Sequence, residues 1–289
     1  MFLPLCFPCA LNRQKGDLDM NKNALNSVWT VALIICLVLA VFAVIFASVL
    51  GNHSKPVEAA ATPVPAEPTA YVAPVDDTAS NVSAATLPET PDAGAEYIDG
   101  IFFLGDKALS ALKDDGMLTG ADASKQVWVP DGGRLPLQEL DTTAYRSPVT
   151  GNNAPAADIA LVNKPAVILI FPSPDNANMV TRDELVASYD ILVSAILEQS
   201  PDTKIILSSL TPIAASYEYE DLTNEKIEEI NGWIAEAAEQ TGAKYLDAFA
   251  GLLNSQGFLS EEYHDGDGLH LSSAGMELWL DYVKTHAYQ

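Results

Sequence analysis

Residues 101–109 read Ile-Phe-Phe-Leu-Gly-Asp-Lys-Ala-Leu, and this stretch decides the predicted fold. The apolar run over 98–104 predicts a buried strand, and Gly105 predicts a tight turn after it. The spacing over 106–113 is helical, with Asp106 as a candidate N-cap. A strand that runs directly into a helix is typical of an α/β domain with a parallel sheet. Whether Asp106 only caps the helix or also serves a site stays open at this stage.

Strands and helices alternate along the rest of the chain. Residues 166–171 form a continuous apolar run bounded by prolines, which predicts a central parallel strand. Further strands are predicted at 126–129, 204–210 and 244–246, and helices at 154–162, 182–199, 224–241 and 271–286, the last with Ser272 or Ser273 as its N-cap. This alternation indicates a parallel sheet covered on both faces, in which ligands bind at the carboxyl ends of the strands.

The loop Asp267-Gly268-Leu269-His270-Leu271 places a carboxylate and an imidazole three residues apart, just before the last predicted helix. Together with Gly105 and Asp106, it resembles the last and first sequence blocks of the SGNH/GDSL hydrolases. The resemblance covers roughly residues 96–289 and is strongest to the membrane-tethered forms of Gram-positive bacteria. It implies a flavodoxin-like three-layer α/β/α sandwich with a parallel sheet, the SGNH hydrolase fold, and hydrolysis of esters or O-acetyl groups.

The resemblance assigns the catalytic base to His270 and the carboxylate that orients it to Asp267. Lys107, however, stands where the family has its nucleophilic serine. A lysine ammonium is not nucleophilic until it loses a proton, and acyl transfer to an amine gives an amide that does not turn over as an ester does. Ser110 lies one helical turn farther on and is a poor replacement. Without the serine, a hydrogen bond that only stabilises the loop is the favoured interpretation of the Asp267–His270 pair.

The oxyanion-hole residues that the resemblance implies are also altered. Phe171 falls where the family has a glycine, Ser173 falls where it has an asparagine, and two prolines remove N–H donors from the same loop. Asn176 remains a candidate binding residue, together with Gly133 and Gly105. Because both the nucleophile and an oxyanion donor are changed, the sequence predicts a catalytically degenerate hydrolase domain.

No metal or cofactor is expected from the sequence. His53, His264 and His286 have no ligand spacing with carboxylates or with one another. Cys6 and Cys9 form a C-x-x-C pair without the strand–helix context of a redox motif. No cysteine follows Cys36, so neither disulfides nor thiol catalysis are expected in the C-terminal domain.

The N-terminal third predicts a membrane anchor. Residues 28–51 form an uncharged apolar run of about 24 residues, or ~36 Å as a helix, which is enough to cross a bilayer. A cleavable signal peptide usually has a shorter apolar stretch, and a lipoprotein would need small residues before Cys36. Arg13, Lys15 and Lys22 place residues 1–27 in the cytoplasm by the positive-inside rule.

The predicted domain organisation is a cytoplasmic segment at 1–27, one transmembrane helix at 28–51, a disordered Pro/Ala/Thr-rich linker at 52–94 and a hydrolase-like domain at 95–289. Met20 is a second possible translation start.

The formal net charge of −24 disfavours nucleic acid as a partner. The expected partners are the cell membrane, through the one helix, and an envelope glycan or a small ester or carboxylate ligand. The sequence thus predicts a single-pass membrane protein with an extracellular domain that acts as a binding or accessory module. Two alternatives are an active esterase or O-acetyl hydrolase that does not use serine, and a structural spacer.

Overall fold

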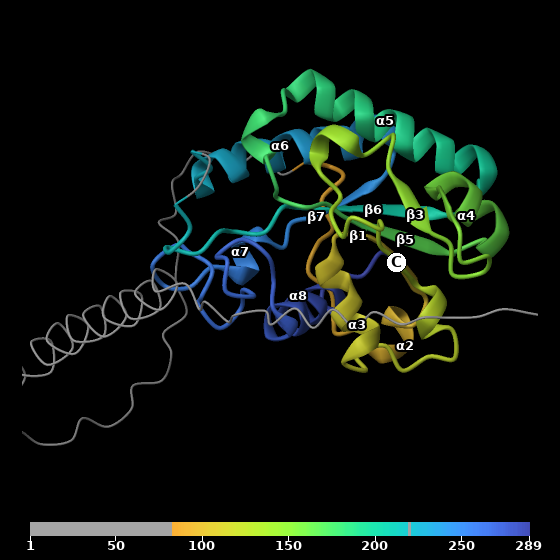
Figure 1. Ribbon diagram of the computed structural model, residues 1–289, viewed down its shortest axis with the longest axis horizontal. Coiled ribbons are helices and arrows are strands. Elements are labelled where there is room, and N and C mark those ends of the chain that lie inside the picture. Colours follow the sequence, from red (N-terminus) through yellow and green to blue (C-terminus); the bar gives the residue numbers. More distant parts are fainter. Residues whose placement is uncertain (1–82, 219–220) are drawn as a thin grey trace, which may run out of the picture. The chain divides into compact units, whose positions relative to one another are not determined.

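The computed structural model describes residues 83–218 and 221–289 (Figure 1). The predicted membrane span at 28–51, its cytoplasmic flank and most of the predicted linker lie outside these residues. Across the described part of the chain, no helix is both long enough and apolar enough to span a membrane.

The core of the domain is a five-stranded parallel sheet with the strand order β2-β1-β5-β6-β7. The central strand β5 is buried at every position, as the continuous apolar run predicts for a strand covered on both faces. It pairs with β1 in the register Phe103↔Leu169 and Gly105↔Phe171. The strands are β1 (Ile101–Gly105), β2 (Val127–Trp128), β5 (Val167–Phe171), β6 (Lys204–Ser208) and β7 (Lys244–Leu246).

Helices cover both faces of this sheet and confirm the predicted three-layer α/β/α architecture (Figure 1). One face packs against α4 (Ala156–Asn163), α5 (Arg182–Gln199) and α6 (Asn224–Thr241). The other packs against α2 (Gly94–Ile98), α3 (Ser110–Asp114), α7 (Phe249–Leu252) and α8 (Ser273–Lys284). Alternate residues of the central strands contribute to the two separate apolar clusters, so the sheet divides the core.

Shorter elements complete the described domain. They are the antiparallel pair β3 (Ala144–Arg146) and β4 (Asn153–Pro155), and the 3₁₀ turns η1 (Lys107–Leu109), η2 (Ala123–Lys125), η3 (Leu137–Glu139) and η4 (Ala177–Met179).

The two longest helices of the described domain, α5 and α6, begin and end where the sequence predicts, because their ends carry strong local signals. Thr181 and Glu184 form a capping box at the start of α5. The Thr223 side chain caps α6, which ends at Gly242 in a left-handed conformation. At α8, Ser272 is the N-cap, and its hydroxyl accepts a hydrogen bond from the Gly275 N–H.

The predictions for the start of the domain need correction. Residue 98 ends α2 and the strand begins only at Ile101, while the helix predicted at 106–113 is divided into η1 and α3. Residues 83–94, which the sequence assigns to the linker, pack on the domain. Ala85 and Leu87 are buried, and the Leu87 N–H donates to the Tyr245 carbonyl at 2.8 Å.

Candidate active site

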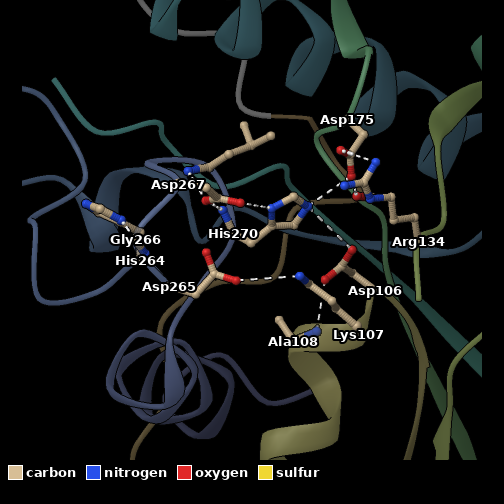
Figure 2. A network of polar contacts seen from close by, with 12 residues as sticks. Asp106, Lys107, Ala108, Arg134, Asp175, His264, Asp265, Gly266, Asp267 and His270 are labelled. Atoms are coloured by element: carbon tan, nitrogen blue, oxygen red, sulfur yellow. Dashed lines mark hydrogen bonds and ion pairs between the residues drawn. The ribbon is translucent and has the colours of Figure 1, made fainter. Parts of the chain in front are cut away.

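The carboxyl ends of β1 and β5 and the loop before α8 bring three side chains together (Figure 2). Asp106 follows β1 directly, Asp175 lies just beyond β5, and His270 lies on the loop that leads into α8. Each side chain offers one nitrogen or oxygen atom that could bind a metal, and these three atoms lie within 4.8 Å of one another. The site therefore occupies the strand edge at which parallel α/β folds bind ligands.

The Gly105 turn allows Asp106 to reach this position. A Cβ atom at residue 105 would lie 1.8 Å from the Phe171 carbonyl oxygen, so only glycine lets the end of β1 approach β5 this closely. The Asp106 N–H then donates to the same carbonyl at 3.0 Å. Asp106 Oδ1 accepts a hydrogen bond from the Ala108 N–H at 2.9 Å, while Oδ2 lies 3.9 Å from His270 Nε2. Asp106 thus both caps η1 and faces the site.

Asp267 holds the His270 ring from one side. Its Oδ2 lies 2.6 Å from His270 Nδ1. Its Oδ1 accepts hydrogen bonds from the backbone N–H groups of Leu269 and His270, at 2.8 and 2.9 Å. The pairing has the geometry of a base and the carboxylate that orients it.

Asp175, which is not among the site residues predicted from the sequence, binds the opposite nitrogen of the His270 ring. His270 Nε2 lies 2.9 Å from Asp175 Oδ2. Arg134 Nη1 lies 3.3 Å from Asp175 Oδ1, and the Ser173 hydroxyl donates to Oδ2. The only sequence signal was that Asp175 lies in the proline-containing loop already noted for its missing oxyanion donors.

The carboxylates around His270 change its protonation. Burial lowers the pKa of His270, but the hydrogen bonds to Asp175 and Asp267 outweigh burial and raise it to about 9. Burial opposes the shifts of both partners too, yet the pKa values of Asp267 and Asp175 are lowered by their hydrogen bonds. The pKa of Asp106 is raised, chiefly by burial. At neutral pH the ring is therefore a cation that donates a hydrogen bond to a carboxylate on each side.

Lys107 points toward the loop that carries Asp265 (Figure 2). Its Nζ lies 3.5 Å from Asp265 Oδ2, so its partner is a carboxylate outside the predicted site residues. About half of its side chain is exposed. The Lys107 N–H donates to the Gly133 carbonyl at 2.7 Å, which places Gly133 beside the first turn of the helix.

Two other predicted binding residues, Ser173 and Asn176, have hydrogen-bond partners other than the His270 ring. Ser173 is fully buried, with its hydroxyl bonded to Asp175 and its N–H donating to the Leu135 carbonyl at 2.8 Å. Asn176 is exposed in a left-handed conformation, and its carbonyl accepts a hydrogen bond from Gln138 at 2.7 Å. The structure thus brings Ser173 to the site through Asp175 and leaves Asn176 at the rim.

His264 shapes the loop that carries Asp265 and Asp267. Its Nδ1 accepts hydrogen bonds from the N–H groups of Gly266 and Gly268, both at 3.0 Å. Its Nε2 lies 2.9 Å from Glu261. Because Nδ1 accepts twice, the neutral ring with its proton on Nε2 satisfies all three contacts. His264 therefore has a structural role next to the site.

Residues 138–278 match the model of the GDSL-like Lipase/Acylhydrolase family. The chain contains a GDSL-like lipase/acylhydrolase domain. The match includes Asp175 and the Asp267–His270 loop and begins after Lys107. The parallel three-layer sandwich of the GDSL-like domain is the SGNH hydrolase fold.

Solved structures similar to the GDSL-like domain include three from different organisms. A candidate GDSL-like lipase from Parabacteroides merdae is 14% identical, with 70% of this chain and 98% of that chain covered and a TM-score of 0.46. A carbohydrate esterase of family 3 from Talaromyces cellulolyticus is 16% identical, with coverage of 64% and 93% and a TM-score of 0.40. The periplasmic domain of a lipopolysaccharide acetyltransferase from Salmonella ser. Paratyphi A is 20% identical, with coverage of 63% and 81% and a TM-score of 0.40. No curated protein matches the sequence.

Proposed function

We propose that this protein is a membrane-tethered extracellular GDSL-like protein that binds an envelope ligand beside His270 and has no serine-esterase turnover. The observation that carries the proposal is the pairing of His270 Nε2 with the Asp175 carboxylate. The sequence resemblance adds that Lys107 stands where the family has its nucleophile.

Serine-esterase chemistry needs a hydroxyl within hydrogen-bond reach of a neutral imidazole. Within residues 83–218 and 221–289, the polar contacts of the His270 ring are all with carboxylates. The nearby Ser173 hydroxyl is buried and donates to Asp175. The raised pKa of His270 keeps a proton on Nε2 at neutral pH, so the ring is not available as a general base.

Binding is the better-supported role because cationic groups remain accessible beside the ring. The side chains of Arg134 and Lys107 are each about half exposed, and each reaches toward the site from a different element. An envelope ligand with a carboxylate, or a glycan that carries one, would pair with these two exposed cations beside His270. The membrane tether rests on the apolar run at 28–51 and the basic residues before it.

Hydrolysis of p-nitrophenyl acetate by the full-length protein in detergent tests the proposal. Wild type should remain at the buffer background. Lys107→Ser alone should recover little, because Asp175 still holds His270 Nε2 and loss of one oxyanion donor typically costs ~10²–10³ in rate. Adding Asp175→Ala to Lys107→Ser frees the ring and should raise the rate above that of either single variant.

His270→Ala in the double variant is the matched control and should return the rate to background. Robust turnover by wild type that His270→Ala abolishes would overturn the proposal. That result would favour instead an esterase that does not use serine.

A further inference from the structure

One oxygen atom in the site has no hydrogen-bond partner. Asp106 is only 1% exposed, and its Oδ2 is a buried carboxylate oxygen that accepts no hydrogen bond in the described part of the chain. Leaving a buried polar atom unpaired is costly, and native structures contain few such atoms. Oδ2 points toward His270 Nε2 and the Asp175 side chain (Figure 2).

We propose that Asp106, Asp175 and His270 together bind a divalent transition-metal ion such as Zn²⁺. The donor set of one imidazole nitrogen and two carboxylate oxygens suits Zn²⁺. With metal–ligand distances of ~2.0–2.2 Å, the ligand atoms of a tetrahedral site lie about 3.4 Å apart. The distances from His270 Nε2 to Asp175 and Asp106, 2.9 and 3.9 Å, lie on either side of that value.

The outer contacts of the three side chains are those of a prepared metal site. His270 Nδ1 is bonded to Asp267, so the ring presents Nε2 to the ion in the carboxylate–histidine–metal arrangement. Asp106 Oδ1 is bonded to the Ala108 N–H, and Asp175 Oδ1 is paired with Arg134. Each ligand is thus held through one atom while another atom faces the ion, and the ion-facing Asp175 Oδ2 also accepts a hydrogen bond from the Ser173 hydroxyl.

Binding exchanges a proton for the ion. His270 loses the Nε2 proton to solvent, and the nitrogen lone pair that held it becomes the ligand. The charges that oppose the ion are Arg134, which contacts the far oxygen of Asp175, and Lys107, which is paired with Asp265. The carboxylates of Asp106 and Asp175 face the ion directly.

A second group of possible ligands, Asp265, Asp267 and His270, shares the histidine but lies at the exposed side. Both oxygens of Asp267 are already engaged, by His270 Nδ1 and by two backbone N–H groups. Those bonds would have to break before Asp267 could bind an ion. In the inner group the hydrogen bond between His270 Nε2 and Asp175 Oδ2 must also break, but there the ion gives a partner to the buried Asp106 Oδ2, which accepts no hydrogen bond, so we place the ion there.

The test is titration of the full-length protein with Zn²⁺ by calorimetry in detergent, after treatment with EDTA. Cys6, Cys9 and Cys36 are changed to Ser in this parent protein, which removes the thiols as competing ligands. We expect one Zn²⁺ to bind per chain and to raise the melting temperature. Asp106→Asn, Asp175→Asn and His270→Gln should each weaken binding at least tenfold.

Two variants serve as controls. Asp265→Asn changes the outer group, and Asp141→Asn makes the same chemical change at an exposed position outside both ligand groups, so both should bind Zn²⁺ as the parent does. Melting in EDTA shows whether each variant is folded before titration.

The inference fails if the folded parent binds no stoichiometric Zn²⁺, or if Asp106→Asn binds as tightly as the parent. It also fails if Asp265→Asn loses binding while Asp106→Asn keeps it, because the ion would then lie in the outer group. The inference is independent of the proposed function: ester turnover by wild type would contradict that function and leave the measured binding unchanged.

Discussion

At the scale of single residues, Asp106 shows how a site can lower the stability of its own protein. Its carboxyl group is buried, one of its oxygens accepts no hydrogen bond, and burial raises its pKa above the ordinary value of 3.8. At neutral pH the folded protein must hold this group charged, or bind a proton that the unfolded chain does not bind. Either way the group costs folding free energy.

The change Asp106→Asn should therefore stabilise the protein in EDTA at neutral pH. Asparagine keeps an acceptor for the Ala108 N–H and removes the charge. Because the folded-state pKa is raised, the folded state binds more protons between 3.8 and that pKa, and wild-type stability rises as the pH falls through this window.

Urea unfolding at several pH values measures this effect. The advantage of Asp106→Asn should be constant above the folded-state pKa and should shrink as the pH approaches 3.8. An advantage that is absent at neutral pH, or that grows in acid, would show that the carboxylate is satisfied in the folded protein.

At the scale of elements, the junction of β1 with η1 depends on one glycine. A methyl group at residue 105 would collide with the Phe171 carbonyl on the neighbouring strand, and backbone atoms cannot move aside as a side chain can. Gly105→Ala should lower the free energy of unfolding by at least about 2 kcal/mol, as overpacking in a core does. It should also displace Asp106 and so weaken Zn²⁺ binding.

Gly232→Ala is the matched control for this prediction. Gly232 lies within α6, and a Cβ there would meet no atom within 4 Å. Alanine should raise the free energy of unfolding by roughly 0.5–1 kcal/mol, because it is the better helix former. Chemical denaturation of both variants gives the comparison, and equal effects would contradict the steric argument.

The elements also show which predictions the sequence can support. The helices α5 and α6 are predicted to their ends because caps and apolar spacing are local signals. The apolar spacing after Asp106 does not distinguish a 3₁₀ turn followed by a short helix from one longer helix. Asp175 pairs with His270 across 95 residues, and no local pattern in the sequence encodes such a contact. The same limit explains why ligand spacing along the chain did not point to the proposed metal site.

At the scale of the whole molecule, the domain begins before the residue at which its apolar periodicity begins. Residues 83–94 have the Pro- and Thr-containing composition of the linker, yet Thr86 pairs with β7 and the Thr90 N–H donates to the Thr285 carbonyl at 2.7 Å. Composition reports how much apolar surface a segment can bury alone. It does not predict that the segment pairs with β7, the strand at the edge of the sheet.

Protease treatment of intact cells tests the predicted topology and this boundary together. An external protease of broad specificity should release a soluble fragment that begins between about 56 and 82, where the sequence is rich in Pro, Ala and Thr. It should spare residues 83–94, since these pack on the domain.

The change Leu87→Ala removes a buried side chain of this segment and should move some of the cleavage into 83–94. The change Glu89→Ala, at an exposed position, should leave the pattern unchanged. Mass spectrometry of the released fragment gives its first residue. A domain that is cut only after the cells are lysed would place it in the cytoplasm and contradict the anchor at 28–51, whereas wild-type cleavage within 83–94 would contradict only the boundary.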